Sequence, residues 1–176
     1  MVYQTFRCVL PALLAFGAIQ IAVPPLPAAD EVFANPEAIV RGLYAAVSIE
    51  PGKKHDWKYV RSFFAPRAVL AVRKTPTTME IIDVDEFVKW FVDDVERFKM
   101  EANGFEESIE KLKLIEFGDM AHCLVVYKAR LKTPPDRPGQ LGLDSFHLLK
   151  KDGRWWIVSI ANDVVTAQRP LPKEVR

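Results

Sequence analysis

Two carboxylates near the C-terminus have the residue type and spacing for acid–base chemistry. Asp144 and Asp163 flank Asp152-Gly153, the strongest short-range signal for a β-hairpin. Because side chains along a strand alternate between faces, both acids are predicted on one face, diagonally placed at roughly 7–8 Å. An apolar cavity raises the pKa of a carboxyl group, so this pair could serve as general acid and base. The alternative is that both lie hydrated at a rim or cap a loop.

The register of this hairpin determines which side chains accompany the two acids. Counting outward from the turn predicts the pairs Leu148–Ile157, Phe146–Ser159 and Asp144–Ala161. One face would then carry Asp144, Phe146, Leu148, Trp155, Ile157 and Asp163, and the other His147, Leu149, Trp156, Val158 and Ile160. The second face is too apolar for plain solvent exposure. We therefore expect a homodimer interface formed by Leu149, Trp156 and Val158.

A tyrosine and a cysteine on the preceding apolar segment are the next candidates. Tyr127 is expected to share a face with Cys123, Val125 and Ala129, so its hydroxyl could reach a ligand. The alternative is a core tyrosine bonded to a backbone carbonyl. Cys123 fits a buried thiol that packs as a small hydrophobe. The sequence has no HxH, CxxC or HExxH spacing, no glycine-rich phosphate loop and no GxSxG, so we expect no metal and no cofactor.

Three helices are predicted ahead of these strands. Asn35-Pro36-Glu37 has the pattern of a helix start, with a capping residue, a proline in the first turn and an acid behind it. Asp56 begins a second, short helix that buries Trp57, Val60, Phe63 and Phe64. Asp83 followed by Glu86 has the character of a capping box and opens a third helix with a long apolar stripe. Trp90 lies nearer the polar side of this helix, where it could cover a neighbouring element or a partner.

The remaining elements are strands, and their order indicates the fold class. Strand patterns cover residues 68–73, 79–82, 105–117, 121–132, 141–151 and 154–165. Helices first and long antiparallel strands afterwards predict an α+β fold. We expect three N-terminal helices packed on the concave face of a strongly curved, mainly antiparallel sheet, a cone-shaped barrel with a pocket. That pocket is the place to look for function.

Residues 1–29 are expected to be a signal peptide rather than part of the fold. They carry one cation, Arg7, then an apolar run from Val9 to Val23, and they end in Pro27-Ala28-Ala29. The run is shorter than a stable membrane span needs, so we expect a secreted or periplasmic location, with a retained N-terminal anchor as the alternative. The folded domain is then residues 30–166, and residues 167–176 are expected to be a flexible tail.

The charge balance bears on the class of partner. The chain has 24 Lys and Arg against 23 Asp and Glu, and removal of residues 1–29 takes away only Arg7, so 23 basic and 23 acidic residues remain. A nucleic-acid binder normally has a basic excess, because neutralisation of phosphates drives its affinity. We therefore expect no nucleic-acid partner.

Four segments stand in a recognisable order: PEAIVRGLYAAV, FFAPRAVL, VDEFVKWFVDDV and FHLLKKDGRWWIVSI. In this order and spacing, over about residues 32–165, the chain resembles the nuclear transport factor 2-like superfamily, which includes ketosteroid isomerases and SnoaL-like polyketide cyclases. The resemblance implies a pocket between the helices and the concave sheet, and dimerisation through the sheet. The pocket residues it implies are Leu43, Tyr44, Trp57, Phe64, Phe91, Tyr127, Phe146, Trp155 and Ile157.

The match to the isomerase branch is partial. Asp144 falls where that branch keeps a protonated Asp as an oxyanion donor, and Phe146 matches a pocket Phe two residues later. The general base of that branch falls at Val72, where no carboxylate stands. Its tyrosine on the first helix corresponds to Tyr44 or, in the closest alignment of the neighbouring alanines, to Leu43. The resemblance therefore implies the fold more fully than the activity.

Three functions stay open at this point. We prefer an exported domain that binds a small apolar or amphipathic ligand without catalysis, because the cavity face is apolar and the base is missing. The alternatives are an isomerase, cyclase or dehydratase that uses Asp144 and Asp163, and a partner-binding module whose pocket is filled. An open cavity with a deeply buried Asp144 and no cationic partner would favour the enzyme. A cavity free of carboxylates would favour the binding domain.

Overall fold

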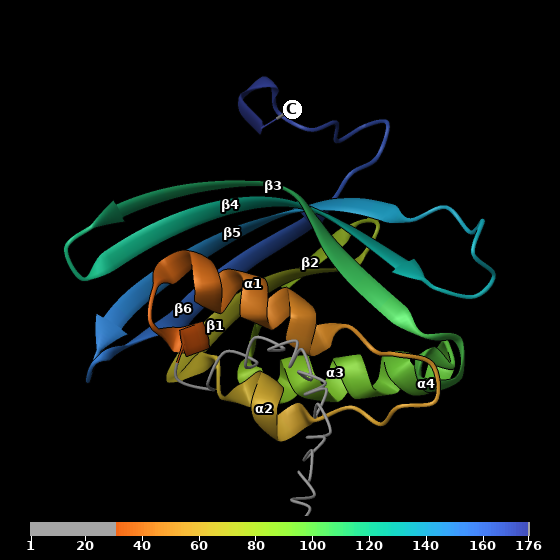
Figure 1. Ribbon diagram of the computed structural model, residues 1–176. Coiled ribbons are helices and arrows are strands. Elements are labelled where there is room, and N and C mark those ends of the chain that lie inside the picture. The colour runs from red at the N-terminus through yellow and green to blue at the C-terminus, as the bar shows by residue number, and fades with distance from the viewer. Residues whose placement is uncertain (1–30, 176) are drawn as a thin grey trace, which may run out of the picture.

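The computed structural model describes residues 31–175, which form an open six-stranded sheet with the α-helices on one face (Figure 1). The predicted signal peptide lies outside the described residues. The helices are η1 (Glu31–Phe33), α1 (Pro36–Val47), α2 (Trp57–Arg61), α3 (Val84–Arg97), α4 (Met100–Asn103) and η2 (Lys173–Val175). The strands are β1 (Phe64–Thr75), β2 (Thr78–Asp83), β3 (Phe105–Phe117), β4 (Met120–Leu131), β5 (Gln140–Lys151) and β6 (Arg154–Val164).

The sheet has the strand order β2-β1-β6-β5-β4-β3. Neighbouring strands are antiparallel except β1 and β6, which are parallel, so the predicted mainly antiparallel α+β fold is confirmed. In Figure 1 the long strands arch over α1 and α3, which lie beneath the sheet. The sheet does not close, because β2 and β3 are its two edges.

The helix starts lie where the sequence predicts them. The side chain of Asn35 accepts a hydrogen bond of 2.7 Å from the backbone N–H of Ala38. Asp83 and Glu86 form both hydrogen bonds of a capping box, which fixes the start of α3. The second helix is shorter than expected, because Phe64 already belongs to β1 and pairs in parallel with Ile157 of β6. Pairing within the sheet thus places Phe64, which the local pattern assigns to a helix, in a strand.

The β5–β6 hairpin follows the predicted register only as far as Leu148–Ile157. Beyond that pair Val158 is an extra, bulged residue, so the observed pairs are His147–Ser159, Phe146–Ile160 and Asp144–Asn162. The predicted pairs Phe146–Ser159 and Asp144–Ala161 are wrong, since a shift of one residue moves each later side chain to the other face. Ile160, expected on the outer face, is 7% exposed and lines the cavity, and Asn162 replaces Asp163 beside Asp144.

The two adjacent tryptophans of β6 have different surroundings. Trp155 is 2% exposed in the core, as predicted. Trp156 is half-buried, and the Arg154 guanidinium lies 3.8 Å from its ring centroid. The same guanidinium lies 3.6 Å from the ring centroid of Phe33 and donates a 2.7 Å hydrogen bond to the Ser62 carbonyl. Arg154 therefore joins the sheet to η1 and to the end of α2.

Loss of this contact is expected to lower stability. Replacing Arg154 by Ala removes two cation–π contacts, the hydrogen bond to Ser62 and a longer one of 3.4 Å to the Trp155 carbonyl, which together contribute about 1–2 kcal/mol at a partly exposed site. Chemical denaturation should therefore show a lower free energy of unfolding for Arg154→Ala than for Arg67→Ala, since Arg67 is an exposed residue of β1. Equal losses in the two variants would contradict the role given to Arg154.

The C-terminal segment, expected to be flexible, lies on the outer face of the sheet, opposite the helices (Figure 1). Val175 is 8% exposed and lies beside Leu124 and Val126 of β4. Arg169 donates a hydrogen bond of 3.2 Å to the carbonyl of Pro76. These contacts hold the segment at both of its ends.

Candidate functional site

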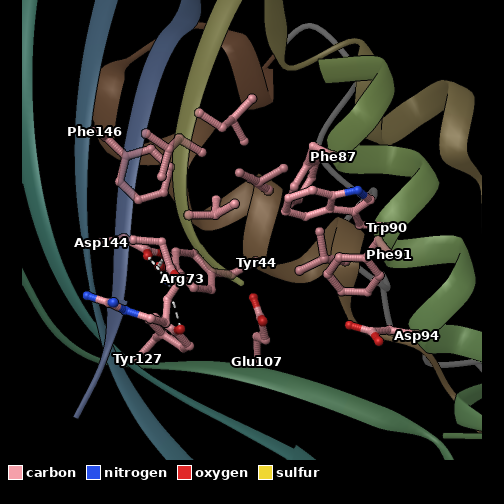
Figure 2. A pocket seen from close by; sticks show the side chains of 16 residues that line it. Tyr44, Arg73, Phe87, Trp90, Phe91, Asp94, Glu107, Tyr127, Asp144 and Phe146 are labelled. Atoms are coloured by element: carbon pink, nitrogen blue, oxygen red, sulfur yellow. Dashed lines mark hydrogen bonds between the residues drawn. The ribbon is translucent and has the colours of Figure 1, made fainter. Parts of the chain in front are cut away.

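A cavity of about 220 Å³ lies between the concave face of the sheet and helices α1 and α3 (Figure 2). Of the residues predicted for the pocket, the structure brings together Leu43, Tyr44, Phe91, Tyr127, Phe146 and the candidate acid Asp144. Four others pack behind this lining: Trp57, Phe64, Trp155 and Ile157. The rings of Trp57 and Phe64 lie 5.4 Å and 5.9 Å from those of Phe91 and Phe87, so they support the α3 wall from behind.

Asp144 stands in the cavity as a buried carboxylate held by neutral donors. The Tyr44 hydroxyl donates a 2.5 Å hydrogen bond to Oδ2, and the Asn162 side-chain amide donates a 2.6 Å hydrogen bond to Oδ1. Asp144 is 9% exposed, and no cation of the described residues pairs with it. Burial raises the pKa of Asp144 to about 6, although the hydrogen bonds from Tyr44 and Asn162 oppose that rise.

The two tyrosines of the cavity use their hydroxyl groups differently. Tyr44 directs its proton to Asp144, whereas the Tyr127 oxygen accepts a 2.8 Å hydrogen bond from Asn162. None of the described residues accepts the Tyr127 proton. Burial and the charge of Asp144 raise the pKa of both tyrosines well above the ordinary value, so both hydroxyls stay protonated. Tyr127 shares the inner face with Cys123 and Val125, as predicted.

Glu107 of β3 is a second cavity carboxyl group, and we did not predict it. Its side chain extends into the cavity opposite Asp144 (Figure 2) and accepts no hydrogen bond from the described residues. Burial, together with the charge of Asp144, raises the pKa of Glu107 to about 8. Glu110 is a bulged residue in the β3–β4 pairing. Without this bulge, the count from the Gly118 turn would place Glu107 on the outer face, so no signal of the local sequence identifies it.

Asp163, the predicted partner of Asp144, serves a different purpose. Both its oxygens accept hydrogen bonds from Arg73, at 3.0 Å and 2.7 Å, and Arg169 lies 3.4 Å away. The hydrogen bond from Arg73 is the main cause that holds the pKa of Asp163 below its usual range. The predicted shared face with Asp144 is therefore wrong. Asp163 instead neutralises Arg73. Arg73 lines the cavity next to Val72, the position that the resemblance assigns to the general base of the isomerase branch and that carries no carboxylate here.

Helix α3 supplies the wall opposite the sheet. Phe87, Trp90 and Phe91 turn toward the cavity, and the exposed Asp94 lies below Phe91 in Figure 2. Trp90, which the sequence places near the polar side, covers a neighbouring element as expected: Lys74 Nζ of β1 lies 4.4 Å from its ring centroid. The cavity thus has an aromatic wall facing a polar floor.

The position of Tyr127 depends on a glycine on the adjacent strand. Gly142 pairs with Tyr127, and a Cβ atom at Gly142 would lie 2.2 Å from Cζ of the tyrosine ring. Replacing Gly142 by Ala is therefore expected to displace the ring and lower the unfolding free energy by about 1–3 kcal/mol. In a Tyr127→Leu background the same replacement should cost much less, which thermal unfolding of the four proteins of the cycle would measure. An equal cost in both backgrounds would exclude a clash with the ring.

The described residues contain no group of three or more potential metal ligands. Among residues 31–175, no helix has the length and apolar character needed to cross a membrane.

Comparisons with known proteins identify the fold. No protein-family model matches the sequence, and no curated protein matches it. A Nostoc punctiforme protein with a cystatin-like fold is similar at a TM-score of 0.58 and 11% identity, covering 74% of this chain and 89% of that one. A proposed scytalone dehydratase from Novosphingobium aromaticivorans has a TM-score of 0.54 and 14% identity, covering 74% and 81%. A proposed ketosteroid isomerase from Shewanella frigidimarina has a TM-score of 0.51 and 17% identity, covering 71% and 91%. The chain therefore has the nuclear transport factor 2-like fold, as the resemblance implied.

Proposed function

We propose that this chain, with its nuclear transport factor 2-like fold and its open cavity, is a proton-transfer enzyme for a small uncharged molecule, with Asp144 as the proton acceptor. The observation that carries the proposal is a buried Asp144 carboxylate that neutral donors, and no cation, hold at the wall of an open cavity. The apolar cavity face and the absence of a carboxylate at Val72 favour a ligand-binding domain without catalysis. A deeply buried Asp144 in an open cavity, without a cationic partner, favours an enzyme instead.

The properties of Asp144 suit a general base. With a pKa of about 6, Asp144 is ionised at neutral pH, yet it is a stronger base than an ordinary aspartate. In the proposed step a C–H bond of the substrate breaks, the proton passes to an Asp144 oxygen and the electron pair stays on the substrate. Return of that proton to another carbon completes an isomerisation. In an elimination the C–O bond to a hydroxyl group breaks, and the hydroxyl takes the proton from Asp144 and leaves as water. Both outcomes balance without a co-reactant.

The charges around the cavity support an uncharged substrate. Asp144, Glu107 and Asp94 line it, and the one cationic side chain of the described lining, Arg73, is bound to Asp163. A carboxylate or phosphate ligand would have to approach Asp144 without a free cation to offset the repulsion. The aromatic wall of α3 favours a compact apolar skeleton instead.

A substrate panel tests the proposal. The purified protein is incubated with cyclic β,γ-unsaturated ketones and with hydroxy ketones that can lose water, the two reaction types that the names of similar proteins suggest. Proton nuclear magnetic resonance in deuterated buffer detects isomerisation, dehydration and exchange at acidic C–H positions. Saturable turnover or exchange supports the proposal. A panel of compounds that bind without any exchange would support the ligand-binding domain instead.

We also infer a homodimer through the outer face of the sheet. Leu149 is 38% exposed there beside its strand partner Met120 at 58%, and Ile115 of β3 is 60% exposed, whereas Trp156 is partly covered by Arg154. Replacing Leu149 by Glu is expected to raise the dimer dissociation constant at least about tenfold, because a charge would be buried in an apolar interface. Sedimentation equilibrium measures this, with Ile81→Glu on the β2 edge as the control. A monomeric parent protein, or equal effects of the two replacements, would exclude this interface.

Export by the N-terminal segment is a further part of the proposal. Cleavage after Ala28 or Ala29 fits the small residues at the end of the apolar run. Mass spectrometry of the mature protein from the cell envelope or medium would identify the new N-terminus. An intact Met1 on protein from the cytoplasm would exclude export.

A further inference from the structure

Tyr127 brings to the cavity a hydroxyl proton that the protein itself does not use. The ring is 6% exposed, and its oxygen is held by the Asn162 amide at 2.8 Å. That bond uses a lone pair of the oxygen and leaves the O–H free to donate. Tyr44 is different, because its proton already binds Asp144. Of these two buried hydroxyls, only Tyr127 is free to donate to a ligand.

Glu107 lies beside Tyr127 on the inner face of the sheet. In the β3–β4 pairing, Tyr127 is opposite Ile109 and Glu107 is opposite Ala129. The two side chains are therefore diagonal neighbours on adjacent strands, where Cα atoms stand roughly 7–8 Å apart. Figure 2 shows both extending from the lower strands toward the cavity. A single ligand oxygen between them could contact both.

We propose that the Tyr127 hydroxyl and the Glu107 carboxyl form a two-donor site for the carbonyl oxygen of the substrate. This inference rests on the proposed function, and it narrows the uncharged substrate to a ketone or aldehyde. A carbonyl oxygen has two lone pairs and no proton, so it can accept both hydrogen bonds. The carbon skeleton would lie against Phe87, Trp90 and Phe91 of α3.

The protonation of Glu107 supports its role as a donor. Burial and the charge of Asp144 raise the pKa of Glu107 to about 8, so the carboxyl is neutral below that pH. The titratable and charged groups that line the same cavity are Asp144 on β5, Tyr44 on α1, Tyr127 on β4, Asp94 on α3 and Arg73 on β1. Arg73 is bound to Asp163, and no described cation pairs with Glu107. The one cation of this lining is therefore neutralised by another carboxylate, and burial remains the main influence on Glu107.

The two donors also fit the chemistry at Asp144. A carbonyl group acidifies the neighbouring C–H bond, which is the bond that Asp144 is proposed to break. When that proton leaves, negative charge develops on the carbonyl oxygen, and donors fixed in advance stabilise it. The proposed base, Asp144 on β5, and the proposed oxygen site, Glu107 on β3 with Tyr127 on β4, therefore line the same cavity.

Infrared spectroscopy of a bound ketone tests the site without any turnover. The probe is 2-cyclohexen-1-one carrying ¹³C at its carbonyl, titrated into the full chain. Two hydrogen bonds should shift the carbonyl band below its position in water, and Tyr127→Phe should reverse most of the shift and weaken binding about tenfold. Tyr59→Phe removes an equivalent hydroxyl from exposed α2 and should change neither value. An unchanged band in Tyr127→Phe would overturn the proposal.

Glu107→Gln separates the second donor from its charge. The amide of this variant still donates, so ketone binding at pH 6 should persist. The parent protein should lose affinity as the pH rises through 8, because Glu107 then loses its proton, whereas the variant should not. Loss of affinity with the same pH dependence in both proteins would exclude Glu107 from the site, and absence of saturable ketone binding would exclude the site altogether.

These results are distinguishable from those on the proposed function. If the carbonyl band shifts in a way that depends on Tyr127 while the protein turns over no compound of the panel, that result supports the oxygen site and contradicts the enzyme proposal. If turnover depends on Asp144 but the carbonyl band is the same in Tyr127→Phe as in the parent protein, the oxygen site is contradicted and the enzyme proposal stands.

Discussion

Replacing Asp144 by Asn is expected to lower kcat by about 10²–10⁴-fold, the range typical of losing a positioned general base. The variant keeps the shape of the side chain but cannot accept a proton at pH 7. Its carbonyl oxygen can still accept from Asn162, and its amide can donate to the Tyr44 oxygen, because the hydroxyl of Tyr44 is free to rotate. The network around the cavity should therefore persist. Progress curves on the best substrate of the panel would measure the loss.

The matched control for this prediction is Asp93→Asn. Asp93 is an exposed residue of α3 outside the cavity lining, and its replacement makes the same chemical change at a distance from Asp144. The control should retain the activity of the parent protein. Thermal unfolding of the Asp144 variant should show a midpoint no lower than that of the parent, since burial disfavours the charge that is removed. A folded Asp144→Asn protein with unchanged kcat would remove Asp144 from the mechanism.

The pH dependence of kcat/KM is expected to be bell-shaped, with limbs near 6 and 8. Activity should rise as the pH passes about 6, because Asp144 with its raised pKa then becomes the ionised base. It should fall as the pH passes about 8, because Glu107 then loses the proton with which it holds the substrate oxygen. Steady-state rates between pH 5 and 9.5 would measure both limbs. Glu107→Gln should abolish the alkaline limb and leave the acid limb in place.

The stability of the free protein gives a substrate-free check on the same groups. The folded-state pKa of Glu107 is raised from 4.5 to about 8, so the folded chain binds more protons than the unfolded chain between these values. Its contribution to stability is therefore complete below about 4.5 and is lost as the pH rises through 8. Denaturation at several pH values should show a flatter dependence for Glu107→Gln than for the parent protein. Identical slopes would mean that the pKa of Glu107 is not raised.

Local patterns in the sequence predict much of the fold. Asn35 and the Asp83–Glu86 pair mark helix starts through hydrogen bonds that involve neighbours within three residues. Asp152-Gly153 marks the hairpin because Asp152 and Gly153 both have a positive φ there, as this kind of turn requires. The alternation of β6 correctly places Trp155 inside. Each of these features depends on a few adjacent residues, so the sequence carries the information locally.

The sequence by itself determined the α+β class, the helix starts, the central hairpin turn and the presence of Asp144 beside Phe146 in an apolar setting. The tertiary structure alone decided which other polar groups lie near Asp144. The bulge at Glu110 shifts β3 by one residue and directs Glu107 into the cavity. The bulge at Val158 shifts β6 in the same way, so Asn162 faces the cavity and Asp163 pairs with Arg73. The physical reason is that strand side chains alternate with a period of two, so one extra residue reverses every face beyond it. Where such a residue is accommodated depends on packing across the whole sheet.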